Sequence, residues 1–361
     1  MIRIFKLIIV LFLAAGHSIY AQSTQQETAL KMGREAIRLM DKGQFDESIK
    51  LLEEAQQLDP ENINYPYELA YAYYSKKDYQ KSRKYLERIL KHKDINPMVY
   101  QLLGNSYDHL GKSDKAIATY EAGLKLFPDA GNLYLEMGVM QIGKKDYHKA
   151  LAYYEKGIDV DPSFPSNYYW AAKIYCNSTE EIWGMIYGEL FMNMERNSKR
   201  TVEISKLLYD TYKSEIHFKS DTSWSVSFSQ NISLAIGEDM EPKDIKIPFQ
   251  LVYEPILVLS MVQVKTIDIH TLNTIRSAFV DNYFSNENDK THPNILFSYQ
   301  KKIKDAGHME AYNYWLLMKG DEAEFDQWYK ANRDKWDRFA DWFTDNQLII
   351  DSNHKFHRKQ Y

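Results

Sequence analysis

The chain has 361 residues, of which 44% are hydrophobic and 26% are charged, which is the composition of a globular protein and excludes a disordered one. Its formal net charge of −5 offers no general attraction to phosphate backbones, so we expect no nucleic-acid partner. The single cysteine, Cys176, excludes an internal disulfide and is expected to be a small apolar filler.

The first residues have the layout of a secretory signal peptide. Arg3 and Lys6 precede an apolar run over residues 7–15, and the small residue Ala21 follows. The run is too short to span a bilayer. We therefore predict a signal peptide over residues 1–21, with Gly16 as the alternative cleavage point. The protein is expected to be exported, periplasmic or secreted, with no integral membrane segment after cleavage.

A sequence repeat with a step of 34 residues runs from residue 29 to residue 162. Within each unit, apolar residues recur at helical spacing in two blocks, and the break between them contains Gly43, Gly111 or Gly143 in three of the units. The pattern predicts helical hairpins that cross closely at small residues and pack aromatic residues against the next hairpin. The step links Ala36, Ala70, Gly104, Gly138 and Ala172, and also Leu52, Leu86, Tyr120 and Tyr154.

This pattern closely resembles the tetratricopeptide repeat (TPR). Taken with the predicted signal peptide, it indicates an exported TPR protein of bacterial type. The resemblance implies a mainly α fold, a TPR-type α-solenoid with four units over residues 29–162. Residues 163–218 are expected to form a fifth, degenerate and longer hairpin, followed by a capping helix over residues 201–218. In such a stack the first helix of each hairpin lines a concave groove that binds a peptide or protein partner.

The resemblance places a set of side chains in that groove. The family's carboxylate-clamp type needs Lys, Arg and Asn there, whereas Gln101 stands where a Lys is needed and Glu136 where an Asn is needed. We therefore expect a peptide ligand with apolar side chains; alternatively, the tyrosines pack against each other or against the C-terminal third. The expected partner-binding residues are Tyr67, Tyr71, Tyr74, Gln101, Asn105, Asp108, Leu135 and Tyr169, with Val139, Ile142 and Lys173 beside them.

Residues 219–361 match no recognised family and are expected to be mostly helical. Trp224, Val226 and Phe228 alternate with serines, and the apolar residues at 232, 234 and 236 follow the same step of two, which favours a small β-hairpin. A helix is preferred around Pro255, with strand-turn-helix as the alternative, and helices are predicted over residues 270–284 and 295–347, separated by a loop over 285–294. Four tryptophans in the last stretch indicate a core, or alternatively an exposed aromatic face: Trp315, Trp328, Trp336 and Trp342.

No residue cluster announces a reaction, so no catalytic residue, metal site or cofactor is assigned. His354 and His357 have a spacing that could hold a metal, but they lie in a charged segment that reads as a solvated end. The preferred function is an exported TPR scaffold or adaptor that binds its partner through the groove. The alternatives are an enzyme with its active site in residues 219–347, to which the repeats present substrate, and a purely structural envelope protein.

Overall fold

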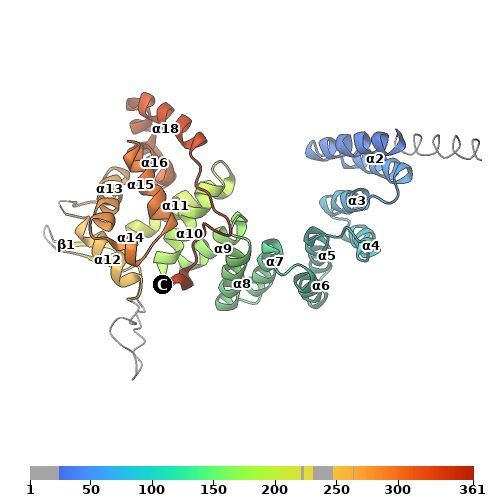
Figure 1. The fold of residues 1–361 in the computed structure, drawn as a ribbon, viewed down its shortest axis with the longest axis horizontal. Coiled ribbons are helices and arrows are strands. Elements are labelled where there is room, and N and C mark those ends of the chain that lie inside the picture. Colours follow the sequence, from blue (N-terminus) through green and yellow to red (C-terminus); the bar gives the residue numbers. More distant parts are fainter. Residues whose placement is uncertain (1–23, 221–222, 231–246, 263) are drawn as a thin grey trace, which may run out of the picture. The chain divides into compact units, whose positions relative to one another are not determined.

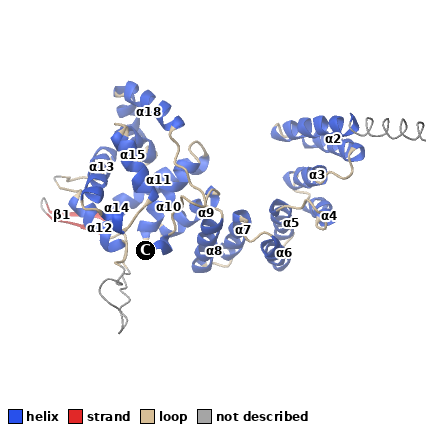
Figure 2. Ribbon diagram, viewed as in Figure 1, coloured by secondary structure: helices blue, strands red, loops and turns tan. Residues whose placement is uncertain are grey.

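The computed structural model describes residues 24–220, 223–230, 247–262 and 264–361, and among them it is helical apart from two short strands (Figures 1 and 2). The chain forms two compact units, residues 1–140 and 141–361. No helix among the described residues is both long enough and apolar enough to cross a membrane. The predicted signal peptide, residues 1–21, lies outside the described residues.

The first unit is a row of helical hairpins, as the repeat predicts. Its second helices begin at residues 45, 79 and 113, and the same 34-residue step continues to 147 and 181 in the second unit. The α-solenoid is therefore confirmed. The first unit contains a helix over residues 24–41, α2 (Phe45–Leu58), α3 (Asn64–Ser75), α4 (Tyr79–Ile89), α5 (Pro97–His109), α6 (Ser113–Leu126) and most of α7 (Gly131–Gly143).

Each of the first four hairpins turns through one residue with left-handed backbone. These residues also follow the 34-residue step: Gly43 (φ 75°), Lys77 (φ 64°), Gly111 (φ 70°) and Lys145 (φ 59°). The prediction for Gly143 is wrong, because this glycine lies two residues earlier, at the end of α7. Lys145 takes the left-handed conformation in its place, at the steric cost that a side chain brings there.

Close helix crossing occurs at the small positions of the repeat. A Cβ atom built on Gly104 would lie 2.1 Å from Cε1 of Tyr120, a fully buried ring of the partner helix α6. Ala36 and Ala70, at the same position in the preceding units, are also fully buried. Small residues therefore allow the two helices of a hairpin to approach each other, and large residues such as Tyr120 fill the space they leave.

We predict that Gly104→Ala lowers the free energy of unfolding by about 1–3 kcal/mol, because the added methyl group overpacks the contact with Tyr120. Urea unfolding followed by circular dichroism measures the effect. Gly143→Ala is the control, since a Cβ atom there meets nothing within 4 Å and the helical backbone gains up to about 1 kcal/mol. Equal unfolding curves for the two variants would contradict the crossing.

The second unit continues the hairpins and adds a helical C-terminal region. Its elements are α8 (Tyr147–Val160), α9 (Pro165–Tyr175), α10 (Glu181–Met194), α11 (Lys199–Glu215), β1 (Ile216–Ser220), β2 (Ser223–Val226), α12 (Gln250–Leu259), α13 (Ile269–Ser285), α14 (Asn288–Thr291), α15 (Ile295–Asp305), α16 (Met309–Leu317), α17 (Glu322–Ala331), α18 (Arg333–Asp345) and the 3₁₀ helix η2 (Arg358–Gln360).

The fifth hairpin and the capping helix each differ in length from their prediction. The hairpin is not longer than the others, because α10 has 14 residues, as α8 does. Gly188 stands where Tyr120 and Tyr154 stand in earlier units, and a Cβ atom there would lie 2.9 Å from Leu208 of α11. Leu208 of the capping helix therefore occupies the space that an aromatic ring fills in the earlier units. The capping helix ends at Glu215 and not at residue 218, since the next residues form β1.

The predicted β-hairpin is present but is offset from the expected residues. β1 pairs antiparallel with β2 in the register Ile216↔Val226 and Phe218↔Trp224, so the end of the predicted capping helix supplies one strand. The residues at 232, 234 and 236 lie outside the described residues. The preferred helix around Pro255 is confirmed as α12, and the predicted loop over 285–294 contains the short helix α14.

Two of the four tryptophans of this region lie in the core, and the other two lie at its edge. Trp315 and Trp328 are buried, and Trp336 and Trp342 are half-buried. Trp328 stacks on Tyr314 with ring centroids 4.3 Å apart. These rings therefore belong to the internal packing of α16, α17 and α18.

The sequence predicts a solvated end for the segment that contains His354 and His357, and only part of it is one, since His354 is exposed. Phe356 and His357 are buried, and Lys355 Nζ lies 2.7 Å from Oδ1 of Asp159 on α8. Arg358 Nε donates to Glu155, a buried carboxylate of the same helix, at 2.5 Å. The charges of this segment are thus used for docking against α8, which a sequence pattern does not reveal.

Candidate functional site

One row of exposed apolar side chains follows the first helices of the first unit. Ile37 on the helix over 24–41, Tyr71 on α3 and Val139 on α7 are 42%, 45% and 36% exposed, and all three occupy the same position of the repeat. Asn105 holds that position on α5 and is half-buried. Sequence reasoning missed Ile37, although it stands 34 residues before Tyr71.

Tyr67 and Tyr74 flank this row and are more enclosed. Both are half-buried and pack on the core of Ala70 and Leu86. Burial raises the pKa of each phenol to about 12. The Tyr74 ring centroid lies 5.4 Å from that of His109 on α5, which joins α3 to the next hairpin. Packing among the repeats therefore fixes two of the three predicted tyrosines and leaves Tyr71 open.

A chain of polar side chains joins α5 to α7 on the same side. Gln101 Nε2 donates to Oε1 of Glu136 at 2.7 Å, and Asn132 Nδ2 donates to Oε1 of Gln101 at 2.8 Å. Asn105 accepts from the buried Tyr120 hydroxyl and donates to Glu136 at 3.4 Å. The amides are thus held in fixed orientations, and burial raises the pKa of Glu136.

The remaining predicted residues of this unit complete one surface. Asp108 is exposed and accepts from the hydroxyl of Ser113 at 2.9 Å, and Leu135 is half-buried. We call this surface the first-helix face, because every member lies on the first helix of a hairpin. It consists of Ile37, Tyr67, Tyr71, Tyr74, Gln101, Asn105, Asp108, Leu135 and Val139.

Tyr169 was predicted to bind the partner, and the structure corrects this prediction. Its side chain is 7% exposed, and its hydroxyl donates to Glu203 of α11. Lys173 Nζ lies 2.6 Å from the same carboxylate, and the Arg200 guanidinium lies 5.2 Å from the ring centroid. Since the capping helix covers Tyr169, this side chain is not available to a partner.

A cleft of about 630 Å³ lies within the second unit, beside α8 and α9. Two of its lining residues, Ile142 and Lys173, hold positions predicted for the groove. Its aromatic lining includes Tyr147, which is half exposed, and Trp170, over which Lys173 Nζ lies at 5.0 Å. The volume is within the range of ligand pockets.

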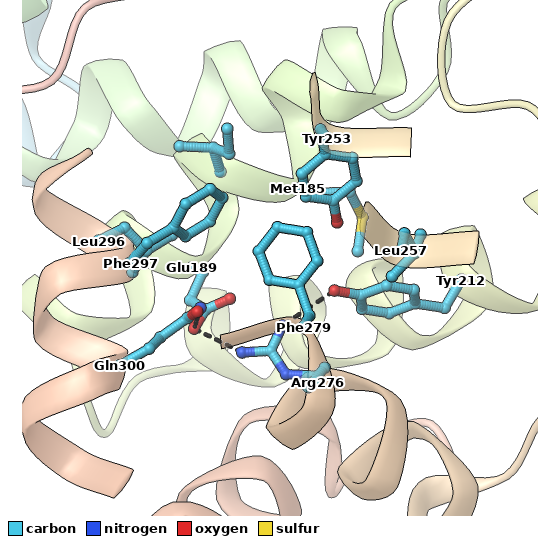
Figure 3. Close-up of a pocket in the computed structure, with 11 residues that line it drawn as sticks. Met185, Glu189, Tyr212, Tyr253, Leu257, Arg276, Phe279, Leu296, Phe297 and Gln300 are labelled. Atoms are coloured by element: carbon cyan, nitrogen blue, oxygen red, sulfur yellow. Dashed lines mark hydrogen bonds and ion pairs between the residues drawn. The ribbon is translucent and has the colours of Figure 1, made fainter. Parts of the chain in front are cut away.

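The core of the second unit contains a buried charge pair. Arg276 Nη2 lies 2.7 Å from Oε1 of Glu189, and both side chains are almost inaccessible to solvent. Figure 3 shows the guanidinium of Arg276 between Glu189 and Tyr212, whose hydroxyl accepts from it at 2.9 Å. Gln300 and Tyr312 donate to Glu189 as well. The adjoining cavity of about 20 Å³ has room for one water molecule and not for a substrate.

Removing one partner of this pair should be strongly destabilising. We predict that Arg276→Leu lowers the free energy of unfolding by about 3–5 kcal/mol, because Glu189 keeps a buried charge without its cation. Arg333→Leu is the matched control, since Arg333 and Asp337 are both more than half exposed and such pairs contribute about 0–1 kcal/mol. Thermal unfolding measures both, and an Arg276 variant as stable as the control would refute the structural role.

The enzyme alternative predicts an active site within residues 219–347; Glu181 lies outside this range, but the charge of Glu254 on α12 acts on it. Glu181 on α10 has its pKa raised to about 7 by burial and by the negative charges of Glu215 and Glu254, which is the range that acid–base catalysis uses. Burial also raises the pKa of Glu254. Among the described residues, no three His, Cys, Asp or Glu side chains are grouped so as to hold a metal ion.

Comparison with known proteins identifies the repeats. Two models described as "Tetratricopeptide repeat" match residues 39–106 and 102–167. Residues 39–167 of this chain are tetratricopeptide repeats. The matched residues thus include α2 to α8 and most of the first-helix face. No curated protein matches the chain.

Solved TPR structures align with about half of the chain. A thermophilic TPR protein of Thermus thermophilus is 15% identical, covers 50% of this chain and 98% of its own, and has a TM-score of 0.43. PilF of Pseudomonas aeruginosa is 16% identical over 53% of this chain and 86% of its own, with a TM-score of 0.44. MamA of Desulfovibrio magneticus is 17% identical over 48% of this chain and 97% of its own, with a TM-score of 0.36.

Proposed function

We propose that this protein is an exported TPR scaffold that binds a peptide or protein segment on its first-helix face. The observation that carries the proposal is the row of exposed apolar side chains at one repeat position, Ile37, Tyr71 and Val139. The repeat positions that pack the helices together are buried, as Ala70 and Leu86 are. Large apolar side chains left in solvent at regular spacing are typical of an interaction surface.

The neighbouring groups suit a bound backbone. Gln101 and Asn105 are held by Glu136, Asn132 and Tyr120, so their remaining hydrogen-bonding capacity is presented in a fixed geometry. Fixed amides lose little conformational entropy when they bind. Tyr71 adds a rigid aromatic anchor of the kind that carries binding energy in interfaces.

Site-specific crosslinking tests the face. With a photoreactive phenylalanine analogue at position 71 or 139, irradiated cells should form one adduct of the same mass from either position, because both side chains project from this face. The matched control is position 126, where Leu126 is an exposed apolar residue (59%) at the end of the second helix α6. Adducts at 126 and none at 71 or 139 would refute the proposed surface.

Export is the second part of the proposal, and it rests on the charge, apolar run and small residue of residues 1–21. The protein recovered from cells should begin at Gln22, because a peptidase removes the preceding segment. N-terminal sequencing of that protein, with cell fractionation, checks this. A chain that retains Met1 and fractionates with cytoplasmic markers would contradict export.

A further inference from the structure

Lys and Arg are distributed unevenly between the two helices of the TPR hairpins. The first helices α3, α5 and α7 contain no Lys or Arg, and their acidic residues are Glu68, Asp108 and Glu136. The second helices carry charges of both signs, for example Lys81, Arg83 and Glu87 on α4. The first-helix face therefore combines tyrosine rings with negative charge.

Glu68 is the most exceptional of these acids. It is half-buried beside Tyr67 and Tyr71, and burial raises the pKa of its carboxyl. In the part of the chain that the structure describes, it has neither an ion-pair partner nor a hydrogen-bond donor. A partly desolvated carboxylate of this kind costs free energy unless something compensates its charge.

Glu136 and Asp108 are compensated by neutral groups only. The donors to Glu136 are the amides of Gln101 and Asn105, and the donor to Asp108 is the Ser113 hydroxyl. Both negative charges also act on Tyr74, whose pKa they help to raise. The two acids and the tyrosine therefore belong to one local environment that no lysine or arginine neutralises among the described contacts.

The acidic surface begins at α3. The preceding helix carries Lys31, Arg34 and Arg38, of which Lys31 and Arg38 pair with Glu27 and Glu35 on their own helix. These cations thus serve the first hairpin. The uncompensated charge lies over α3, α5 and α7, alongside Tyr71 and Val139.

Resting on the proposed function, we propose that the first-helix face binds an extended peptide segment that carries Lys or Arg between apolar side chains. Tyr71 and Val139 contact the apolar side chains, and the cation takes the place beside Glu68 or Glu136 that no cationic group of the described chain occupies. Carboxylates and aromatic faces both attract a desolvated cation, and together they select against acidic segments. The charge is opposite to that of a carboxylate clamp.

The test uses three fluorescein-labelled synthetic decapeptides in which Leu alternates with Arg, Gln or Glu. Fluorescence anisotropy measures their Kd for the purified protein and for E68Q/E136Q. The matched control, E54Q/E121Q, removes the same two charges from exposed positions of α2 and α6. We expect the Arg peptide to bind about tenfold more tightly than the Gln peptide, and this preference to be lost in E68Q/E136Q and kept in the control.

The test variants are expected to fold. Burial raises the pKa of both carboxyls, so their ionisation at neutral pH opposes folding, and E68Q/E136Q should melt no lower than the wild type. The Gln side chain still offers an oxygen to Gln101. The single variant E68Q, which breaks no hydrogen bond of the described structure, should lose part of the preference by itself.

The failure of this inference is distinguishable from that of the proposed function. Equal affinity for the Arg and Gln peptides, with crosslinking through position 71 intact, overturns the cationic ligand and leaves the binding face. An equal loss of Arg-peptide binding in E54Q/E121Q and E68Q/E136Q also overturns it, because the attraction would then follow net charge. Tighter binding of the Glu peptide overturns it as well.

Discussion

The fold of the first unit depends on how closely two helices can cross. At Gly104 the neighbouring Tyr120 ring leaves no space for even a methyl group, and Ala36 and Ala70 are fully buried at the same position of their own hairpins. Because the small residue lies on the first helix and the large one on the second, the large side chain is buried between the two helices. The opposite side of the first helix packs less completely in the stack, and side chains such as Tyr71 and Val139 remain exposed there.

The last hairpin lacks the large side chain of this pairing, and the capping helix packs there instead. Gly188 replaces the aromatic ring of the repeat, and Leu208 of α11 enters the space. The same helix provides Glu203, which holds Tyr169 and Lys173. Closing the last hairpin therefore also covers the first-helix side of α9, so that an end cap and a binding surface exclude each other there.

The sequence predicts the repeat well because its information is local and periodic. The starts of the second helices, the close approach at Gly104 and the exposure of Tyr71 all follow from the 34-residue step. The burial of Tyr169 was not predicted, although Glu203 of α11 lies one repeat step further along the chain, because the capping helix was not expected to cover the groove side of α9. The pairing of Arg276 with Glu189 across 87 residues, and the docking of Arg358 on Glu155 across 203, have no sequence signature either.

The buried and half-buried carboxylates of this chain are stabilised in different ways, and Glu68 beside the first-helix face differs from the others. Glu155 and Glu189 each have an arginine in contact, which is the arrangement that a structural role requires. Among the described residues Glu181 contacts no arginine, and burial raises the pKa of its carboxyl to about 7. Glu68 has neither an arginine in contact among the described residues nor a fully buried carboxyl. It is half-buried and lies beside the exposed Tyr71. A charge kept at this position destabilises the free protein slightly, and a cation that arrives with a partner would remove that cost. The uncompensated acid is thus better explained by an intermolecular contact than by the stability of the repeats.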